Sequence, residues 1–583
     1  MKGKKLLALL LAMMMTAVSF ASCQSTEAES SESSNSSETS TEVEEEVNEN
    51  MDGDVQLSEP GEFPIVIGDM VTFTVFTSPH LDANSEFDSS INQFSAWYEE
   101  KTNIHLEWSI VSSADKTAKL NLIFTSDSYE DIIMNTGWDA ATQYTYGQQG
   151  FIIPLNEYIE NDAYYYPEYV QAGIDCGAWT QSDSDTLIMP DGNIYSAAQY
   201  QVAYPSFSST RLWIYEPWLE ALDLEMPTTT DEYYDVLLAF KTQDPNGNGI
   251  ADEIPLTGSL KGWNTDPLEF LMNSFLYYNS TDKLYADNGD VEIAYAQDEY
   301  KDGLTFMNSL AEADLLLIDT YTQDVNGLKN LTTQDVQLVG SVAGGMIASF
   351  TTATSGEDGD WQNWTHVSPL EGPDGVQYSR YYTPTPTAKI HITDKCEYAR
   401  TAYRLIDSMY EHEIGFNGAL GMQDEYWRYA EEGEIGLNGE DAKFANILSP
   451  SDNGNTATNY AWSQIGVFTS TPGWGPTQAV FGNDPDTDPS TWLFAATDDY
   501  LEYKPDSSLI VPSLIFEDDK SEQVVDYTTT LNEYVSQMTT QFILNGGIEE
   551  GWDSYISGLQ DRGLLELEEL YQEAYEQRME TLG

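Results

Sequence analysis

The sequence predicts an α/β protein with at least two lobes, and three observations support this. Strand-like and helix-like segments alternate in short order over residues 71–137, which is typical of a parallel sheet with helices on its faces. A second unit with its own helical periodicity begins near residue 211. The chain of 583 residues is also long enough to bury two or more cores.

The first unit begins near Phe63. Residues 71–78, VTFTVFTS, alternate apolar and polar side chains as a half-buried strand does. The elements after it alternate in type: helix 89–103, strand 104–111, helix 115–124 and strand 130–137. Ligands of open α/β sheets bind at the loops beyond the carboxyl ends of the strands, and Trp138 and Asp139 stand at such a loop.

The second unit contains a predicted helix within residues 211–241. Thr229 and Glu232 have the spacing of a capping box at its start. The apolar positions that follow fall on one helical face: Tyr233, Val236, Leu237 and Phe240. The last hundred residues are also predicted to be helical, with an apolar stripe that ends at the NGG turn of 545–547. We expect the aromatic side chains of this last region to pack in a core.

The composition restricts the partners of the chain. A formal net charge of −75, from 23 basic and 98 acidic residues, excludes nucleic-acid binding, which needs clustered Lys and Arg. An anionic ligand is disfavoured unless some of the few basic residues line the site, so a neutral ligand fits best. The aromatic content of 12%, with 14 Trp and 37 Tyr, is common in proteins that bind neutral carbohydrates.

Residues 1–22 are typical of a secretion signal. Three lysines precede an uncharged apolar run over 6–20, which is too short to span a bilayer. The segment 20–23, FASC, resembles the lipobox of bacterial lipoproteins. Cys23 is therefore expected to be lipidated and to anchor the chain at the extracellular face of the cell membrane. Ordinary signal cleavage, with no modification of Cys23, is the alternative.

Residues 23–62 form an acidic linker rich in Ser and Glu. Such a segment is expected to stay disordered and, as a coil, to hold the folded part about 35 Å from the membrane. The alternative is a low-complexity spacer without functional consequence. Beyond the linker only Cys176 and Cys396 carry thiols, and neither belongs to a CxxC motif, which disfavours a thiol metal site. Their separation supports a disulfide no more than it excludes one, and we expect them to be unpaired.

The segment 241–256, KTQDPNGNGIADEIPL, has the spacing of a calcium loop. Asp244, Asn246 and Asn248 occupy positions 1, 3 and 5, and Gly249 at position 6 allows the sharp turn. The further expected ligands are the Ile250 carbonyl and the side chains of Asp252 and Glu253. Oxygen ligands without His or Cys suit Ca²⁺. The place of the loop between a helix and a strand favours a structural ion, and an Asx-rich turn without metal is the alternative.

Several segments resemble one family, and they occur in its order along most of the chain. They are GQQGFIIPLNEYIE (147–160), MPDGNIYSAAQY (189–200), the helix and calcium loop of 218–258, VSPLEGPDGVQYSRYY (367–382), ITDKCEYARTAYRLIDSMY (392–410) and the C-terminal segment 551–578. Together with the lipobox they resemble the bacterial extracellular solute-binding proteins of ABC importers, family 1. The resemblance is to the long lipoprotein subgroup that includes alginate-oligosaccharide-binding proteins.

This resemblance implies a two-lobed periplasmic-binding-protein-like (type II) fold, each lobe a mainly parallel sheet flanked by helices, with crossing hinge strands. The expected lobes are N-terminal, 63–203 plus 385–465, and C-terminal, 204–384 plus 466–583. It also implies a monomer, not an enzyme, that closes on an oligosaccharide and delivers it to permease subunits. The calcium ion of the family lies away from the sugar.

Sugar rings present apolar C–H faces and hydroxyl edges, so a sugar site needs aromatic platforms and polar groups of fixed geometry. Trp138 and Trp263 each follow a strand and are the first candidates. The further candidates are Asp139, Tyr381, Tyr382, Gln423, Asp424, Trp427 and Trp474. The family often has Glu and Gly where this chain has Gln423 and Asp424. For each candidate, ordinary core or surface packing is the alternative.

Two other classes of function stay open from the residues. A secreted, calcium-dependent glycoside hydrolase would also be rich in aromatic and acidic residues, although a pair of carboxylates at catalytic distance arises by chance among 98 of them. A surface glycan adhesin would bind polymers without lobe closure. No GxSxG nucleophile motif and no P-loop occur in the sequence.

Overall fold

The computed structural model describes residues 50–583 apart from 79–86, 113–114, 201–202, 352–359, 384–385, 448–458, 466–468, 470, 517 and 583. The expected signal peptide, Cys23 and the linker up to residue 49 lie outside the described residues. In the part that is described, no helix is both long and apolar enough to cross a bilayer.

The first sheet has five strands in the order β5-β4-β6-β14-β7. They are β4 (Val71–Thr77), β5 (Ile104–Ile110), β6 (Ile132–Met134), β7 (Ala197–Gln199) and β14 (Thr387–Ile392). β4 pairs in parallel with β5 and β6, whereas β14 is antiparallel to both β6 and β7. β14 is thus the one reversed strand of this sheet, which is mainly parallel as predicted.

The two helices predicted beside this sheet are confirmed as α1 (Gln93–Thr102) and α2 (Lys116–Thr125). α1 begins later than predicted because Asn92 caps it, with the Ser95 backbone N–H donating to Asn92 Oδ1 at 2.9 Å. β6 is shorter than the predicted strand because Asn135 has a φ of 54°, outside the extended region.

The second sheet has four strands in the order β13-β8-β12-β9. They are β8 (Leu212–Tyr215), β9 (Ile254–Thr257), β12 (Val339–Ala343) and β13 (Trp364–Val367). β12 is parallel to β9, and β8 is antiparallel to both β12 and β13. Again one strand, β8, opposes the direction of the others. The carboxyl ends of β9 and β12 therefore meet the start of β8 at one edge.

The helix predicted after residue 229 is α8 (Thr230–Thr242), and its four predicted apolar residues are all buried. Thr229 caps it by accepting from the Glu232 backbone N–H at 3.1 Å. The capping box is not reciprocal, because Glu232 accepts from the backbone and hydroxyl of Thr228 instead. Gly340 of β12 makes room for this helix: a Cβ there would lie 2.4 Å from the Phe240 ring.

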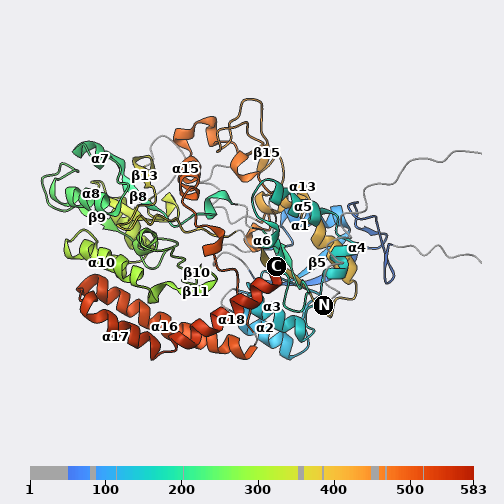
Figure 1. The fold of residues 1–583 in the computed structure, drawn as a ribbon. Helices are drawn as coiled ribbons and strands as arrows, with labels where there is room; N and C mark the ends of the chain where they lie inside the picture. Colours follow the sequence, from blue (N-terminus) through green and yellow to red (C-terminus); the bar gives the residue numbers. More distant parts are fainter. Residues whose placement is uncertain are drawn as a thin grey trace, which may run out of the picture. The chain divides into compact units, whose positions relative to one another are not determined.

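The last region is helical as predicted: α16 (Asp518–Asn545), α17 (Ile548–Gln560) and α18 (Leu564–Leu582). Gly546 and Gly547, both with positive φ, make the turn between the first two. α16 packs against α10 (Asp298–Glu312) (Figure 1). Leu531, Val535 and Phe542 of the predicted stripe are buried in this core, which confirms the packing role.

The two sheets have separate cores, and we keep the two-lobe division as a proposal with one boundary changed. Trp474 lies beyond the expected boundary at 465/466, yet it packs on Phe416, in the cluster of Trp427 and Phe444. Further along the chain, α15 (Pro489–Leu501) packs against the second sheet, where its Trp492 indole donates to the Trp364 carbonyl at 3.0 Å. We therefore place the last crossing after residue 480.

Both cysteines of the described part are free, as expected. Cys176 is exposed, whereas Cys396 is partly buried and its pKa is raised, mainly by burial. A raised pKa keeps the Cys396 thiol protonated and unreactive at neutral pH.

Candidate functional site

Trp263 is the most prominent aromatic residue at the edge of the second sheet. It belongs to the loop after β9, and 48% of its surface is exposed. Its ring lies on the backbone of Gly345, just beyond β12, where a Cβ would come within 2.5 Å of the indole. The Gly345 backbone N–H also donates to the Trp263 carbonyl at 3.3 Å. Glycine at 345 thus seats the ring against the sheet edge while much of the indole stays accessible.

Polar groups are fixed directly beside this indole. Asn264 is buried, and its Nδ2 donates to the Ser209 carbonyl at 3.1 Å and to the Ser209 hydroxyl at 2.9 Å. The Tyr382 hydroxyl donates to Asn264 Oδ1 at 3.2 Å. The structure therefore brings two of the predicted residues, Trp263 and Tyr382, to one place through Asn264. Sequence patterns did not single out Asn264 or Ser209.

Arg211 holds the backbone of this edge in place through hydrogen bonds. It is fully buried just before β8, where its guanidinium donates to the carbonyl of Gly345 and to that of Pro205, and to the Thr497 hydroxyl. Burial lowers the pKa of Arg211 to about 10, so it keeps its charge at neutral pH. In the sequence, Arg211 could be noticed only as an arginine at the start of a predicted segment in a chain poor in basic residues.

Tyr381 lies apart from this hydrogen-bond network. Its carbonyl accepts from the Tyr277 hydroxyl at 3.4 Å, and Lys504 Nζ lies 5.6 Å from its ring centroid. The neighbouring Tyr382 ring has the Arg380 guanidinium 3.9 Å from its centroid. Of these two tyrosines, Tyr382 is the one whose hydroxyl hydrogen-bonds Asn264.

Trp138 occupies the corresponding edge of the first sheet. It follows β6, is partly buried, and its ring centroid lies 4.7 Å from that of His391 and 4.8 Å from that of Tyr146. Asp139 is exposed but caps α3 (Ala140–Gln148), because its Oδ1 accepts from the Thr142 backbone N–H at 2.7 Å. The structure thus places both predicted residues beyond a strand end, and one carboxylate oxygen of Asp139 is already used to cap the helix.

His391 beneath Trp138 predicts a pH dependence of stability. It is fully buried, its Nδ1 donates to the Tyr195 carbonyl at 3.0 Å, and burial lowers its pKa from 6.5 to about 4. The unfolded state therefore binds this proton more readily, so stability falls as pH decreases from 6.5 towards 4. Between pH 7 and pH 5 we expect His391 to account for a loss of about 2 kcal/mol. Urea unfolding of wild type and His391→Gln at both pH values measures the free energy of unfolding. An equal loss between pH 7 and pH 5 in the two proteins would contradict this role of His391.

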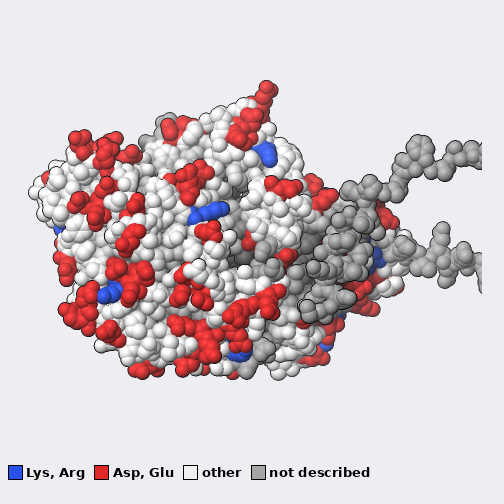
Figure 2. Space-filling view, in the orientation of Figure 1, with Lys and Arg blue, Asp and Glu red and all other residues white. Residues whose placement is uncertain are grey.

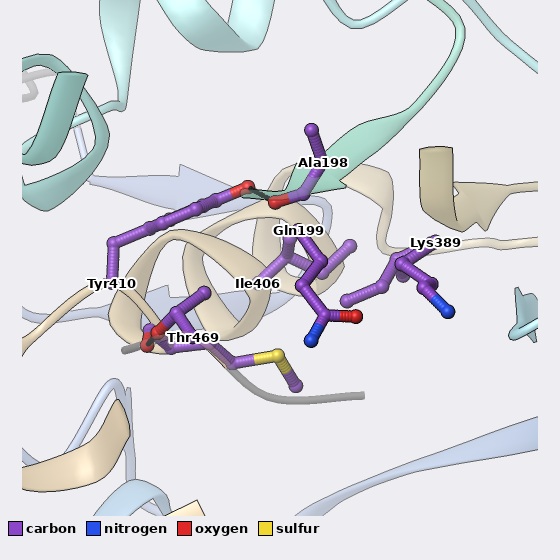
Figure 3. Close-up of a pocket in the computed structure, with 8 residues that line it drawn as sticks. Ala198, Gln199, Lys389, Ile406, Tyr410 and Thr469 are labelled. Carbon is purple, nitrogen blue, oxygen red and sulfur yellow. Dashed lines mark hydrogen bonds between the residues drawn. The ribbon is translucent and has the colours of Figure 1, made fainter. Parts of the chain in front are cut away.

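A small cavity lies beside this edge, between β7, β14 and α12 (Ala399–Ser408) (Figure 3). Its volume of about 10 Å³ is the space of one water molecule, too small for a sugar ring. The Tyr410 hydroxyl closes one side by donating to the Ala198 carbonyl at 2.6 Å. Gln199 and Lys389 line the cavity at the strand ends.

Trp427 is a core residue in this structure. It is fully buried, and its indole N–H donates to Asn417 Oδ1 at 3.1 Å. The Gln423 backbone N–H donates to the same oxygen at 3.0 Å, and Asp424 is exposed with a φ of 65°. Trp474 contacts the ring of His412, 4.2 Å between centroids. Because Trp427 offers no surface to a ligand, we no longer propose it as a sugar platform.

The segment 244–253 forms the turn that its spacing predicts. Gly249 has a φ of 75°, and its N–H donates to Asp244 Oδ2 at 3.1 Å. The Asn246 and Asn248 amides both donate to Asp252, at 3.3 Å and 3.1 Å. Across the described ranges, three or more His, Cys, Asp and Glu side chains are nowhere gathered closely enough to hold a metal ion.

Glu253 nevertheless fits a cation. Glu253 is 3% exposed, and its Oε1 has no hydrogen-bond partner in the described part of the chain. Burial, and then the charges of Asp244 and Asp252, raise its pKa. A buried carboxylate oxygen without a hydrogen-bond partner is destabilising unless a proton or a cation neutralises it. The residue types of this loop, which offer carboxylate, amide and carbonyl oxygens, are those that hold a hard divalent cation such as Ca²⁺.

Sequence comparison relates the chain to known proteins. The family model described as bacterial extracellular solute-binding protein matches residues 78–384, more than half of the chain. The fructooligosaccharide ABC transporter substrate-binding protein FusA of Streptococcus pneumoniae is 24% identical over 494 residues, which cover 82% of this chain and 86% of that protein.

Solved structures show the same fold. FusA in complex with kestose has a TM-score of 0.64 at 22% identity, covering 87% of this chain and 99% of that chain. An HMO-binding solute-binding protein associated with an ABC transporter, from Bifidobacterium longum infantis, has a TM-score of 0.71 at 19% identity. The match covers 88% of this chain and 99% of that chain. The structure of alginate-binding protein AlgQ2 without calcium ion has a TM-score of 0.55 at 17% identity, and the match covers 88% of this chain and 99% of that chain. A structure of a FusA EF-hand mutant also matches, with 0.62 at 22%, covering 87% and 99%.

Proposed function

Because the chain belongs to the bacterial extracellular solute-binding protein family, we propose that it captures a carbohydrate and delivers it to the permease subunits of an ABC importer. The observation that carries this proposal is the exposed Trp263 indole, seated on Gly345 with Asn264 and Tyr382 fixed beside it. The relatives named for fructooligosaccharide and HMO binding support a carbohydrate as the ligand.

The geometry of this edge suits a sugar. The indole face can stack on the C–H face of a ring, and the Tyr382 hydroxyl, which Asn264 holds in place, can accept a hydrogen bond from its hydroxyl edge. Trp138 at the edge of the first sheet would supply the second platform. A sugar that contacts both lobes favours the closed form by its difference in affinity for the two forms. Closure would present the loaded protein to the permeases.

The proposed position in the cell follows from the N-terminus and the family. An extracellular solute-binding protein acts outside the cell, and lipidation of Cys23 would keep it at the membrane as a monomer beside the permeases. The acidic linker would let it move relative to this anchor.

We also propose a structural Ca²⁺, held by the side chains of Asp244, Asn246, Asn248, Asp252 and Glu253 and by the Ile250 carbonyl. The unpartnered Oε1 of Glu253 supports this proposal, as do relatives with an EF-hand and a calcium site in their names. Glu253 immediately precedes β9, whereas Trp263 follows it. Four strand residues extend over roughly 13 Å, so the ion would stabilise the lobe without touching the sugar.

A glycan screen tests the proposed function against the two other classes. Purified protein should gain thermal stability with one class of short soluble glycan, and long incubation with that glycan should release no products. Release of products would indicate a hydrolase, and binding confined to insoluble polymers would indicate an adhesin.

A further inference from the structure

The edge of the first sheet holds a lysine in a fixed position. Lys389 Nζ, on the reversed strand β14, donates to Asn135 Oδ1 at 3.0 Å. Asn135 is buried, its N–H donates to the Lys389 carbonyl at 2.8 Å, and its Nδ2 donates to the Ser78 carbonyl at 2.8 Å. Ser78 follows β4 and Asn135 follows β6, so the ammonium of Lys389 is held where these parallel strands end.

A second lysine lies at the same place. Lys116 begins α2, and its Nζ is 3.4 Å from the position that a Cβ would take on Gly137, two residues after Asn135. Both ammonium groups thus lie at the short segment 135–137, and the pKa of Lys389 is lowered by burial first and then by the charge of Lys116.

No carboxylate among the described residues forms an ion pair with Lys389 or Lys116. Some other lysines do pair with carboxylates, among them Lys101 with Glu413, Lys241 with Asp314 and Lys301 with Glu549. Acidic side chains are spread over the face shown in Figure 2, where Lys and Arg are few. Two neighbouring ammonium groups without a described acidic partner can both bind an anionic ligand.

Other groups at this edge are suited to the same ligand. The Ser78 hydroxyl is buried, with no hydrogen-bond partner in the described ranges. Gln199 ends β7 and lines one cavity together with Lys389 (Figure 3). Trp138 stands one residue beyond Gly137, partly buried on His391. Hydroxyl, amide and aromatic groups next to two ammonium groups match a sugar ring that carries a negative charge.

We propose that the glycan carries an acidic group, a carboxylate or a sulfate ester, which Lys389 and Lys116 bind at the edge of the first sheet. This inference rests on the proposed function and revises the expectation of a neutral sugar. The net charge of −75 repels anions at a distance, but an anion placed between two partly buried ammonium groups removes their repulsion and satisfies both. Neutral glycans would leave that repulsion in place, which gives selectivity.

Matched glycan pairs test this directly. Calorimetry would compare trigalacturonate with its carboxyl-reduced form, and 3′-sialyllactose and 3′-sulfolactose with lactose. We expect the acidic member of at least one pair to bind at least tenfold more tightly, with an advantage that shrinks as salt is added. The sialyl and galacturonate arms report a carboxylate, and the sulfolactose arm a sulfate ester.

Variants assign the effect to the lysines. Lys389→Gln and Lys116→Gln should remove the preference for the acidic member while leaving the affinity for neutral glycans within twofold. Lys119→Gln, at an exposed position of the same helix, should keep the preference. Melting temperatures near that of wild type establish that each variant is folded.

The outcomes separate this inference from the proposed function. Tighter binding of neutral glycans, equal binding of both members, or lysine variants that lose neutral and acidic binding alike would overturn the acidic subsite and leave a sugar-binding protein. If no acidic probe binds but a neutral glycan of a wider panel does, the acidic subsite is likewise overturned and the sugar-binding function is kept. Failure of all glycans would overturn both proposals.

Discussion

Replacing Trp263 by alanine should weaken glycan binding about thirtyfold, equivalent to about 2 kcal/mol. The indole is a large apolar group that stays exposed at the edge of the second sheet, and a sugar ring stacked on it would bury apolar C–H surface. Alanine removes this platform but leaves Gly345 and Asn264 in place. Calorimetry with the best glycan of the screen measures the change.

Leu260→Ala is the matched control, because Leu260 lies in the same loop and is 41% exposed. It should leave the affinity within twofold and the melting temperature unchanged. If Trp263→Ala binds as tightly as wild type, or if Leu260→Ala loses as much affinity, the indole is not the platform and the site must be sought elsewhere.

Removing calcium should lower the melting temperature by about 3–5 °C. An ion at a hundred times its Kd stabilises the folded state by about 2.7 kcal/mol. Without it, the buried carboxylate of Glu253 is left unpaired beside Asp244 and Asp252. Scanning calorimetry with 1 mM Ca²⁺ and with chelator measures the difference, and the glycan affinity of protein that stays folded should hardly change.

Glu253→Gln should remove most of this calcium response, whereas Asp231→Asn should keep it, because Asp231 is an exposed acidic residue of α8 outside the loop. An unchanged melting temperature on chelation would show that the loop is an Asx-rich turn without metal. A glycan affinity that falls in proportion to calcium loss would instead place the ion in the sugar site.

Much of the fold could be predicted because it rests on local patterns. The alternation of VTFTVFTS and the apolar face of α8 correspond to burial in the structure. The reversed strands β14 and β8 could not be predicted, because their direction depends on pairing between segments far apart in sequence. The boundary near residue 466 shifted for the same reason: the contacts of Trp474 with Phe416 are long-range.

The site was predictable only in part. A strand end followed by tryptophan indicated Trp138 and Trp263, but sequence patterns cannot distinguish an exposed ring from a buried one, and Trp427 is fully buried. The groups that position the candidate side chains, such as Asn264 and Asn135, belong to no motif. Their importance follows from burial and hydrogen bonding, which appear only in three dimensions.

X-ray scattering with and without saturating glycan shows whether the two proposed lobes close on the sugar. If the chain closes on a sugar as an importer subunit does, the radius of gyration of wild type should decrease on binding, while Trp263→Ala at the same glycan concentration should stay expanded. Saturated binding by calorimetry with no change in the scattering curve would contradict capture by lobe closure.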